Sequence, residues 1–132
     1  MFGNRWLLEG TKTFITNASN ASVCVVFARV RQARRSRGKY VETIYDARND
    51  KKRHAGITAF LIGSNAPGLR LPPHMGSISV NKLEKWGLCS SHFCEVVFDC
   101  YAEEDAVLGE IGNGFLVAME TLNNGRINIA AQ

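Results

Sequence analysis

The run LEGTKTFITN at residues 8–17 decides the fold of this chain, because it is crowded with β-branched and aromatic residues. Trp6 and Leu7 extend it upstream, and Glu9-Gly10 separates two apolar stretches. Glycine adopts positive φ without steric cost, so Glu9-Gly10 predicts the turn of a hairpin with strands at residues 6–8 and 13–16. The chain therefore opens with β structure.

Further apolar runs follow, each bounded by turn residues. They predict strands at residues 23–28, 57–62, 77–83 and 93–101. The first of these is continuously apolar, which predicts burial on both faces. A further short strand is expected between Pro67-Gly68 and Pro72-Pro73. Short strands at this spacing predict a mainly β fold, a barrel or a sandwich.

The pattern changes from strand-like to helical after Gly109. Apolar residues then recur at the spacing i, i+3, i+4, i+7, which predicts a helix from about Gly114 to Leu122. Residues 123–125, Asn-Asn-Gly, are poor helix formers, so we expect a break there and a second helix from residue 126.

The glycines at 109, 112 and 114 admit two interpretations. A glycine-rich turn ahead of a helix can cradle a phosphate. The run lacks the Lys-Ser/Thr pair of a P-loop and the full dinucleotide-binding spacing. A tight turn from strand to helix is therefore the favoured interpretation.

Composition is that of an ordinary globular domain, with 132 residues, 45% hydrophobic and 21% charged. Residues 29–54 hold ten basic and three acidic side chains, so they carry +7 of a chain whose net charge is +4. We expect residues 31–54 to form a mobile, solvated hairpin excursion with a candidate strand at residues 40–45. Nucleic-acid binding through residues 29–37 is the less favoured alternative, because no aromatic residues interleave with the charges.

The cysteines and histidines do not predict a metal site. The histidines are scattered, and the cysteines lack the spacing of zinc ligands, so free thiols are expected. No run approaches the roughly 18 apolar residues of a membrane span, and residues 1–5 do not resemble a targeting segment. The cysteines are Cys24, Cys89, Cys94 and Cys100, and the histidines are His54, His74 and His92.

Five segments, taken in order, resemble the acyl-CoA dehydrogenase family. Each is weakly specific alone, but together they cover nearly the whole chain. The LNNGR run and the basic excursion point weakly to the very-long-chain branch. The segments are LEGTKTFITN at 8–17, GITAFLI with PGL within 56–69, CEVVF at 94–98, VLGEIGNGF at 107–115 and AMETLNNGRI at 118–127.

The resemblance implies an orthogonal β-barrel at residues 1–108, followed by the truncated start of a helical domain at 109–132. In that family FAD lies against the barrel, with acyl-CoA on the other side of the flavin ring. The reaction is α,β-dehydrogenation of a fatty acyl thioester, with hydride transfer to flavin N5. The implied role of this chain is to supply the flavin-facing wall.

The same resemblance assigns cofactor-facing positions to Phe14, Ile15, Thr16 and Asn17. Phe14 stands where an aromatic packs on the flavin ring, and Thr16 matches a threonine that hydrogen-bonds near N5. Ile15 and Asn17 could offer backbone groups to the polar edge of the ring. Arg126 matches an arginine beside the active site. Without the resemblance, Phe14 and Thr16 are ordinary strand residues and Arg126 is a charge for binding a neighbouring domain.

No catalytic residue is expected within this chain. Gly125 stands where some branches place the base, and other branches place it beyond Gln132. We expect weak or no FAD binding and no dehydrogenase activity from the isolated chain. An enzyme segment and a non-catalytic barrel acting as a binding or assembly module both stay open.

The chain also departs from the family pattern around the S-x-T triplet of that family, which corresponds to residues 91–93. Cys89 replaces a basic residue, Phe93 replaces a threonine, and His92 lies between them. Ala18 replaces a glycine after Asn17. These changes predict a diverged member of the family, a partial gene model or a degraded copy.

The resemblance implies partners and a location for the complete enzyme. Its partners are acyl-CoA, an electron-transferring flavoprotein and further copies of itself. Its location is the mitochondrial matrix in a eukaryote and the cytoplasm in a bacterium.

Overall fold

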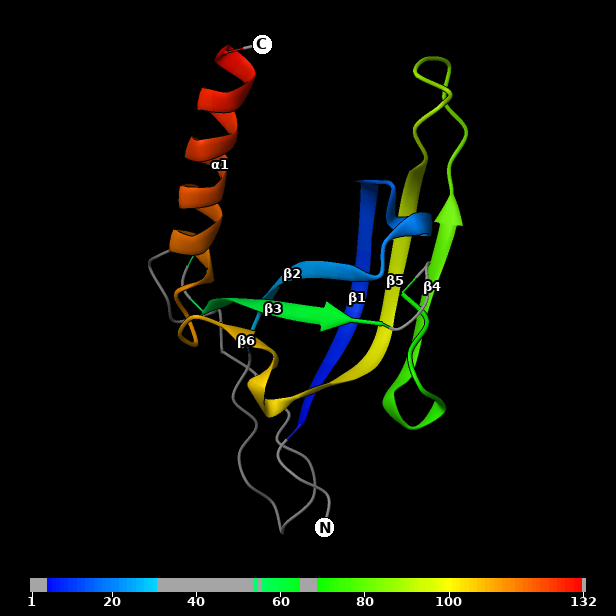
Figure 1. The fold of residues 1–132 in the computed structure, drawn as a ribbon. Helices are drawn as coiled ribbons and strands as arrows, with labels where there is room; N and C mark the ends of the chain where they lie inside the picture. The colour runs from blue at the N-terminus through cyan, green and yellow to red at the C-terminus, as the bar shows by residue number, and fades with distance from the viewer. Residues whose placement is uncertain (1–4, 31–53, 55, 65–68, 132) are drawn as a thin grey trace, which may run out of the picture. The chain divides into compact units, whose positions relative to one another are not determined.

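The computed structural model describes residues 5–30, 54, 56–64 and 69–131 (Figure 1). The chain divides into two compact units, which are described separately. The first unit comprises Met1–Val25 and Leu61–Ala106, and the second comprises Val26–Phe60 and Val107–Gln132.

Strand β5 (Phe93–Glu103) is the centre of the first unit. It pairs antiparallel with β1 (Arg5–Thr16) on one side and with β4 (Gly76–Lys82) on the other (Figure 1). Every second side chain of β5 is buried, which is the period of a strand with one face on a core. The buried set is Cys94, Val96, Phe98, Cys100 and Ala102.

Strand β1 is continuous, so the predicted hairpin at Glu9-Gly10 is wrong. The register runs without interruption from Arg5 opposite Glu103 to Lys12 opposite Val96. Gly10 keeps its place in the ladder with φ 143, and open space surrounds it. Because β5 supplies hydrogen-bond partners along the whole length, the chain passes through this glycine without turning.

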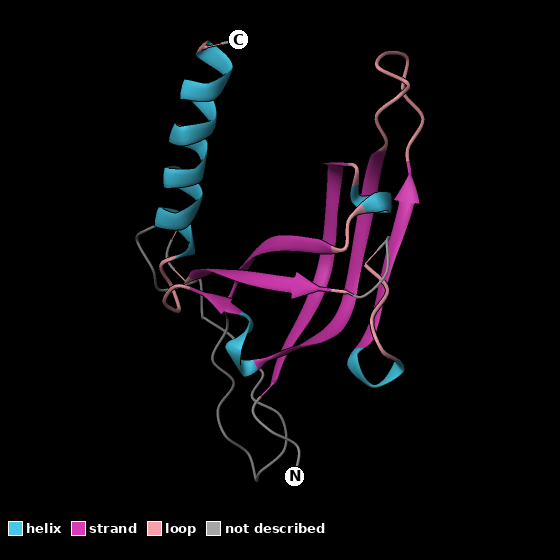
Figure 2. Cartoon of the chain, in the orientation of Figure 1, coloured by secondary structure: helices cyan, strands magenta, loops and turns pink. Residues whose placement is uncertain are grey.

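A second sheet has the strand order β2-β3-β6, formed by β2 (Val23–Arg29), β3 (Ile57–Gly63) and β6 (Val107–Leu108) (Figure 2). The expectation that β2 is buried on both faces is wrong. Val23 and Val25 are 56% and 45% exposed, while Val26 is buried. A continuous apolar run therefore gave the strand correctly but not its burial.

The segment before the 3-10 turn η2 (Pro73–Met75) is not a strand. Residues 69–72 form no ladder among the described residues, so the short strand expected there is wrong. Leu69 instead donates its backbone N–H to the carbonyl of Ala21 and buries its side chain. Two further 3-10 turns, η1 (Ala18–Asn20) and η3 (Glu104–Ala106), follow β1 and β5.

Helix α1 (Gly114–Ala130) begins where the sequence predicts and continues through the predicted break. Asn123, Asn124 and Gly125 lie within it, so the expected second helix is the later part of the first. Poor helix formers cost up to about 1 kcal/mol each, which an established helix tolerates.

A mainly β chain with a C-terminal helix is confirmed. Residues 31–53 lie outside the described residues, as do the candidate strand at 40–45 and the expected mobile excursion. None of the described helices has both the length and the apolar character needed to cross a membrane.

Candidate functional site

Phe14 lies at a bulge in the pairing of β1 with β5. The register shifts between Lys12 and Ile15, so that Thr13 and Phe14 together face the single residue Glu95. Phe14 has φ 66, a conformation that costs an L-residue about 1–2 kcal/mol. Bulges of this kind redirect a side chain, and the Phe14 side chain here is 67% exposed.

The exposed Phe14 ring is stacked on Phe93, the first residue of β5. Their ring centroids are 5.2 Å apart and the ring planes differ by 11°, an offset stack of the kind that aromatic pairs favour. The ammonium Nζ of Lys85 lies 5.9 Å from the centroid of the Phe93 ring, at the limit of a cation–π contact. The result is a flat aromatic surface with a cation near one of its rings.

The residues after Phe14 are exposed as well. Ile15 and Thr16 pair with Cys94 and Phe93, and both side chains face solvent. The described residues supply no hydrogen-bond partner for the Thr16 hydroxyl. The aromatic ring of Phe14 and the hydroxyl of Thr16, two positions further on, are therefore both accessible.

Asn17 ends the strand and joins it to His92. The backbone N–H of Asn17 donates to the carbonyl of His92 at 2.8 Å, and the backbone N–H of His92 donates to Oδ1 of Asn17 at 3.2 Å. Asn17 has φ 58, which asparagine tolerates better than most residues. Because its backbone N–H is already used, its side-chain amide nitrogen is the donor left for a ligand.

The His92 ring is held at both nitrogens. Nδ1 lies 2.7 Å from Oγ of Ser19, and Nε2 lies 3.3 Å from Nζ of Lys82. An ammonium group can only donate, so Nε2 accepts and the proton of the neutral ring is assigned to Nδ1, which donates to Ser19. His92 thus ties β4, the turn η1 and the start of β5 to the end of β1.

Arg126 belongs to the second unit, where it is exposed on α1. Gly125 precedes it within the helix and has no atoms within 4 Å of an added Cβ. Neither residue provides a proton-transfer group in this part of the helix.

The glycine-rich segment ahead of α1 is a packed turn. The backbone N–H of Gly112 donates to Oγ1 of the buried Thr58 at 2.9 Å. A Cβ on Gly114 would lie 2.6 Å from the backbone of Ala59, so the helix start rests directly on β3. These contacts support the tight-turn interpretation over a phosphate cradle.

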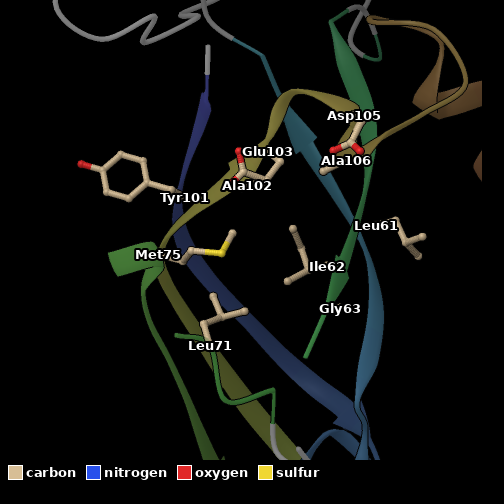
Figure 3. A pocket seen from close by; sticks show the side chains of 10 residues that line it. All are labelled: Leu61, Ile62, Gly63, Leu71, Met75, Tyr101, Ala102, Glu103, Asp105 and Ala106. Carbon is tan, nitrogen blue, oxygen red and sulfur yellow. The ribbon is translucent and has the colours of Figure 1, made fainter. Parts of the chain in front are cut away.

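An open pocket of about 290 Å³ lies elsewhere in the first unit (Figure 3). Ile62, Leu71 and Met75 turn toward one another in it, whereas Tyr101 points outward (Figure 3). None of the four predicted cofactor-facing residues lines it. Glu103 on its border is paired with Arg5, whose Nη2 lies 3.0 Å from the carboxylate. The pocket is therefore separate from the aromatic surface.

All four cysteines are free thiols. Burial raises the pKa of Cys24 from 9.0 to about 11. For Cys100, burial first, then Cys24 and Asp99, raise the pKa from 9.0 to about 11. Such thiols stay protonated at neutral pH and are poor nucleophiles. Within the described ranges, no group of His, Cys, Asp or Glu side chains could hold a metal ion.

Sequence reasoning missed the contacts of His92 and Phe93. Their types marked them as departures from a pattern, but nothing local pairs them with Asn17 and Phe14, 75 and 79 positions away in sequence. A correct register for β1 against β5 would have found them, since Thr16 lies opposite Phe93.

Comparison with known proteins gives a consistent result. The family model "Acyl-CoA dehydrogenase, middle domain" matches residues 2–100. A probable short/branched chain specific acyl-CoA dehydrogenase of Dictyostelium discoideum is 38% identical over 128 residues, covering 96% of this chain and 25% of that protein. The human mitochondrial short-chain specific acyl-CoA dehydrogenase is 38% identical over 131 residues, covering 98% of this chain and 26% of that protein.

Solved structures agree. The structure of glutaryl-coenzyme A dehydrogenase in complex with glutaryl-CoA matches this chain with a TM-score of 0.67 and 27% sequence identity. The match covers 98% of this chain and 26% of the dehydrogenase chain. Butyryl-CoA dehydrogenase from Megasphaera elsdenii matches with a TM-score of 0.64 and 32% sequence identity, over 95% of this chain and 26% of the dehydrogenase chain.

The chain spans about a quarter of the length of these relatives. Both sequence relatives named here carry short-chain names, so they do not single out the very-long-chain branch. The family match covers most of the chain, including the residues of the aromatic surface. The chain therefore belongs to the acyl-CoA dehydrogenase family, whose middle domain it carries at residues 2–100.

Proposed function

We propose that this chain supplies the flavin-facing wall of an FAD-dependent acyl-CoA dehydrogenase. The observation that carries the proposal is the outward-facing Phe14, held at a bulge beside the accessible Thr16 hydroxyl. A regular strand would not need such a conformation, and the family match adds the class of enzyme.

The residues present fit a flavin ring. Isoalloxazine is planar and polar along one edge, and the exposed Phe14 ring, stacked on Phe93, offers it an apolar aromatic face. Thr16 and the side-chain amide of Asn17 lie next in sequence and can donate hydrogen bonds. No disulfide, buried charge or large side chain has to move to expose Phe14, because it is already 67% exposed.

Each residue then has a defined task. Phe14 provides contact area and orients the ring, and the Thr16 hydroxyl donates to a polar ring atom. A bound flavin supplies the two-electron acceptor that acyl-CoA dehydrogenation requires, and the protein tunes it through such hydrogen bonds. Arg126 on α1 is assigned to the active-site side. We assign no residue of this chain as the base that would remove the α-proton, because Gly125, at the position that some branches of the family use, cannot take a proton.

A chimera tests the proposal. The matching quarter of the human short-chain relative is replaced by this chain, and flavin content and acyl-CoA oxidation are measured. We expect a yellow, active protein in which Thr16→Ala lowers the rate about 10-fold or more while most flavin is retained. Thr11→Ala, an exposed threonine on the same strand, is the matched control and should leave both unchanged. An equal effect of the two substitutions would refute the role of Thr16.

The non-catalytic alternative has one observation in its favour. Helix α1 exposes Leu116, Leu122, Ile127 and Ile129, and apolar side chains presented in this number favour an assembly surface. In the complete enzyme we assign that surface to association with other domains or copies.

The remaining partners and the location follow the family. We assign acyl-CoA as substrate and an electron-transferring flavoprotein as electron acceptor. The mitochondrial name of the human relative supports the matrix if the source is a eukaryote, and the cytoplasm is assigned for a bacterium.

A further inference from the structure

Phe93 is the anchored member of the aromatic pair. Phe14 is 67% exposed, whereas Phe93 is half-buried at the start of β5. Phe14 also keeps φ 66, which a residue with a side chain retains only where its surroundings hold it. The Phe14 ring stacks on the ring of Phe93, so Phe93 is the surface against which this conformation is held.

The position of Phe93 is in turn fixed by its neighbour. His92 exchanges two hydrogen bonds with Asn17, and both its ring nitrogens have partners, Ser19 and Lys82. These four contacts come from three residues, Asn17, Ser19 and Lys82. A shift of the backbone at residues 92 and 93 away from Phe14 would break them, so the backbone position of Phe93 is fixed.

We propose that Phe93 is a positioning residue for Phe14. Held by His92, it keeps Phe14 in its outward, left-handed conformation before any ligand arrives. A planar ring that binds there does not have to order the aromatic side chain, and this preorganisation raises affinity. The identity of that ring as flavin rests on the proposed function, whereas the positioning role does not.

The first test is made on the full 132-residue chain without ligand, by nuclear magnetic resonance. We expect upfield ring-current shifts of the Phe14 ring protons and a strong intraresidue HN–Hα cross-peak, the sign of positive φ. Phe93→Leu keeps the apolar volume and should remove both signals, while Phe93→Tyr should keep them. His74→Ala, an exposed histidine of η2, is the control. Amide protection at Val96 reports that each variant is folded.

The second test introduces Phe93→Leu into the chimera with the human short-chain relative and measures its affinity for FAD, because the isolated chain is expected to bind FAD weakly or not at all. Phe93→Leu should weaken binding about 2- to 10-fold, the range that loss of one aromatic pair corresponds to. Absence of FAD from the chimera that carries the parent sequence would count against the proposed flavin surface, whereas the first test decides the positioning role on its own.

The positioning role is overturned if the parent chain lacks the positive φ signal, or if Phe93→Leu retains it. Should the Leu variant not fold, Phe93→Met replaces it, because methionine fills irregular apolar space without a ring.

Discussion

Strand β5 and the end of β1 are hydrogen-bonded neighbours, but they differ in how many of their side chains are buried. β5 buries every second side chain from Cys94 to Ala102, whereas β1 buries none from Glu9 to Thr16. We call β5 the scaffold strand and the end of β1, residues 9–16, the presenting strand. Burial is concentrated in β5, and the end of β1 tolerates a strained exposed residue because the pairing continues on both sides of the bulge.

The largest expected effect is a core truncation on the scaffold strand. Phe98 is 6% exposed, and Phe98→Ala should lower the free energy of unfolding by about 3–5 kcal/mol, because it leaves a cavity. Phe14→Ala on the presenting strand should cost less than about 1 kcal/mol. Urea titrations of both variants measure the contrast. Equal losses would show that the two strands do not differ.

A rise in pH should destabilise the chain through the buried thiol of Cys100 on the scaffold strand and through Cys24 on β2, whose pKa is also raised to about 11. The Cys100 pKa of about 11 exceeds 9.0, so the unfolded chain loses this proton first. The stabilising contribution is complete below pH 9 and is lost as the pH rises to about 11, by roughly 2 kcal/mol. Unfolding measured across this range should show a smaller pH dependence in Cys100→Ala than in the parent. Cys89→Ala, at an exposed thiol, should behave like the parent.

The strain on the presenting strand is measured by comparing two substitutions at one position. Both Phe14→Ala and Phe14→Gly remove the ring, but only glycine adopts φ 66 freely. Phe14→Gly should therefore be more stable than Phe14→Ala by about 1 kcal/mol. If alanine is equally stable, the bulge relaxes and Phe14 does not store strain.

The smallest effect is expected where the two strands meet at the surface. Arg5 and Glu103 form an exposed ion pair, with side chains 30% and 47% exposed. Arg5→Ala should lower stability by no more than about 0.5 kcal/mol, and 1 M salt should reduce that difference further. Thermal unfolding at low and high salt decides this, with Arg70→Ala as an exposed control. A salt-independent loss above about 1 kcal/mol would mean that Arg5 contributes through packing.

The sequence predicted the scaffold strand better than the presenting strand. Alternation of apolar residues predicted a strand at 93–101, and β5 covers Phe93–Glu103. β1 was divided at Gly10, because a glycine between apolar runs signals a turn and only the partner strand, 88 positions on, shows otherwise. Likewise the helix continues through residues 123–125, where local propensity alone predicts a break.

Part of the candidate site could likewise be predicted from the sequence, and part could not. The segment Phe14–Asn17 could be proposed from its own residues and the family pattern. The bulge, the Phe93 stack and the His92 contacts could not, because they depend on register between distant segments. Its cofactor-facing role remains a prediction.

The pairing of β1 with β5 also sets an order of events during synthesis. Arg5 pairs with Glu103, 98 positions later, so β1 leaves the ribosome long before its partner exists. At about 5–20 residues per second, that interval is roughly 5–20 s. During it the strand presents unpaired backbone groups and the apolar Trp6 and Leu8, a template for association with other chains. Production of this protein should therefore depend on chaperones that cover its first strand, and co-translational crosslinking should find them there.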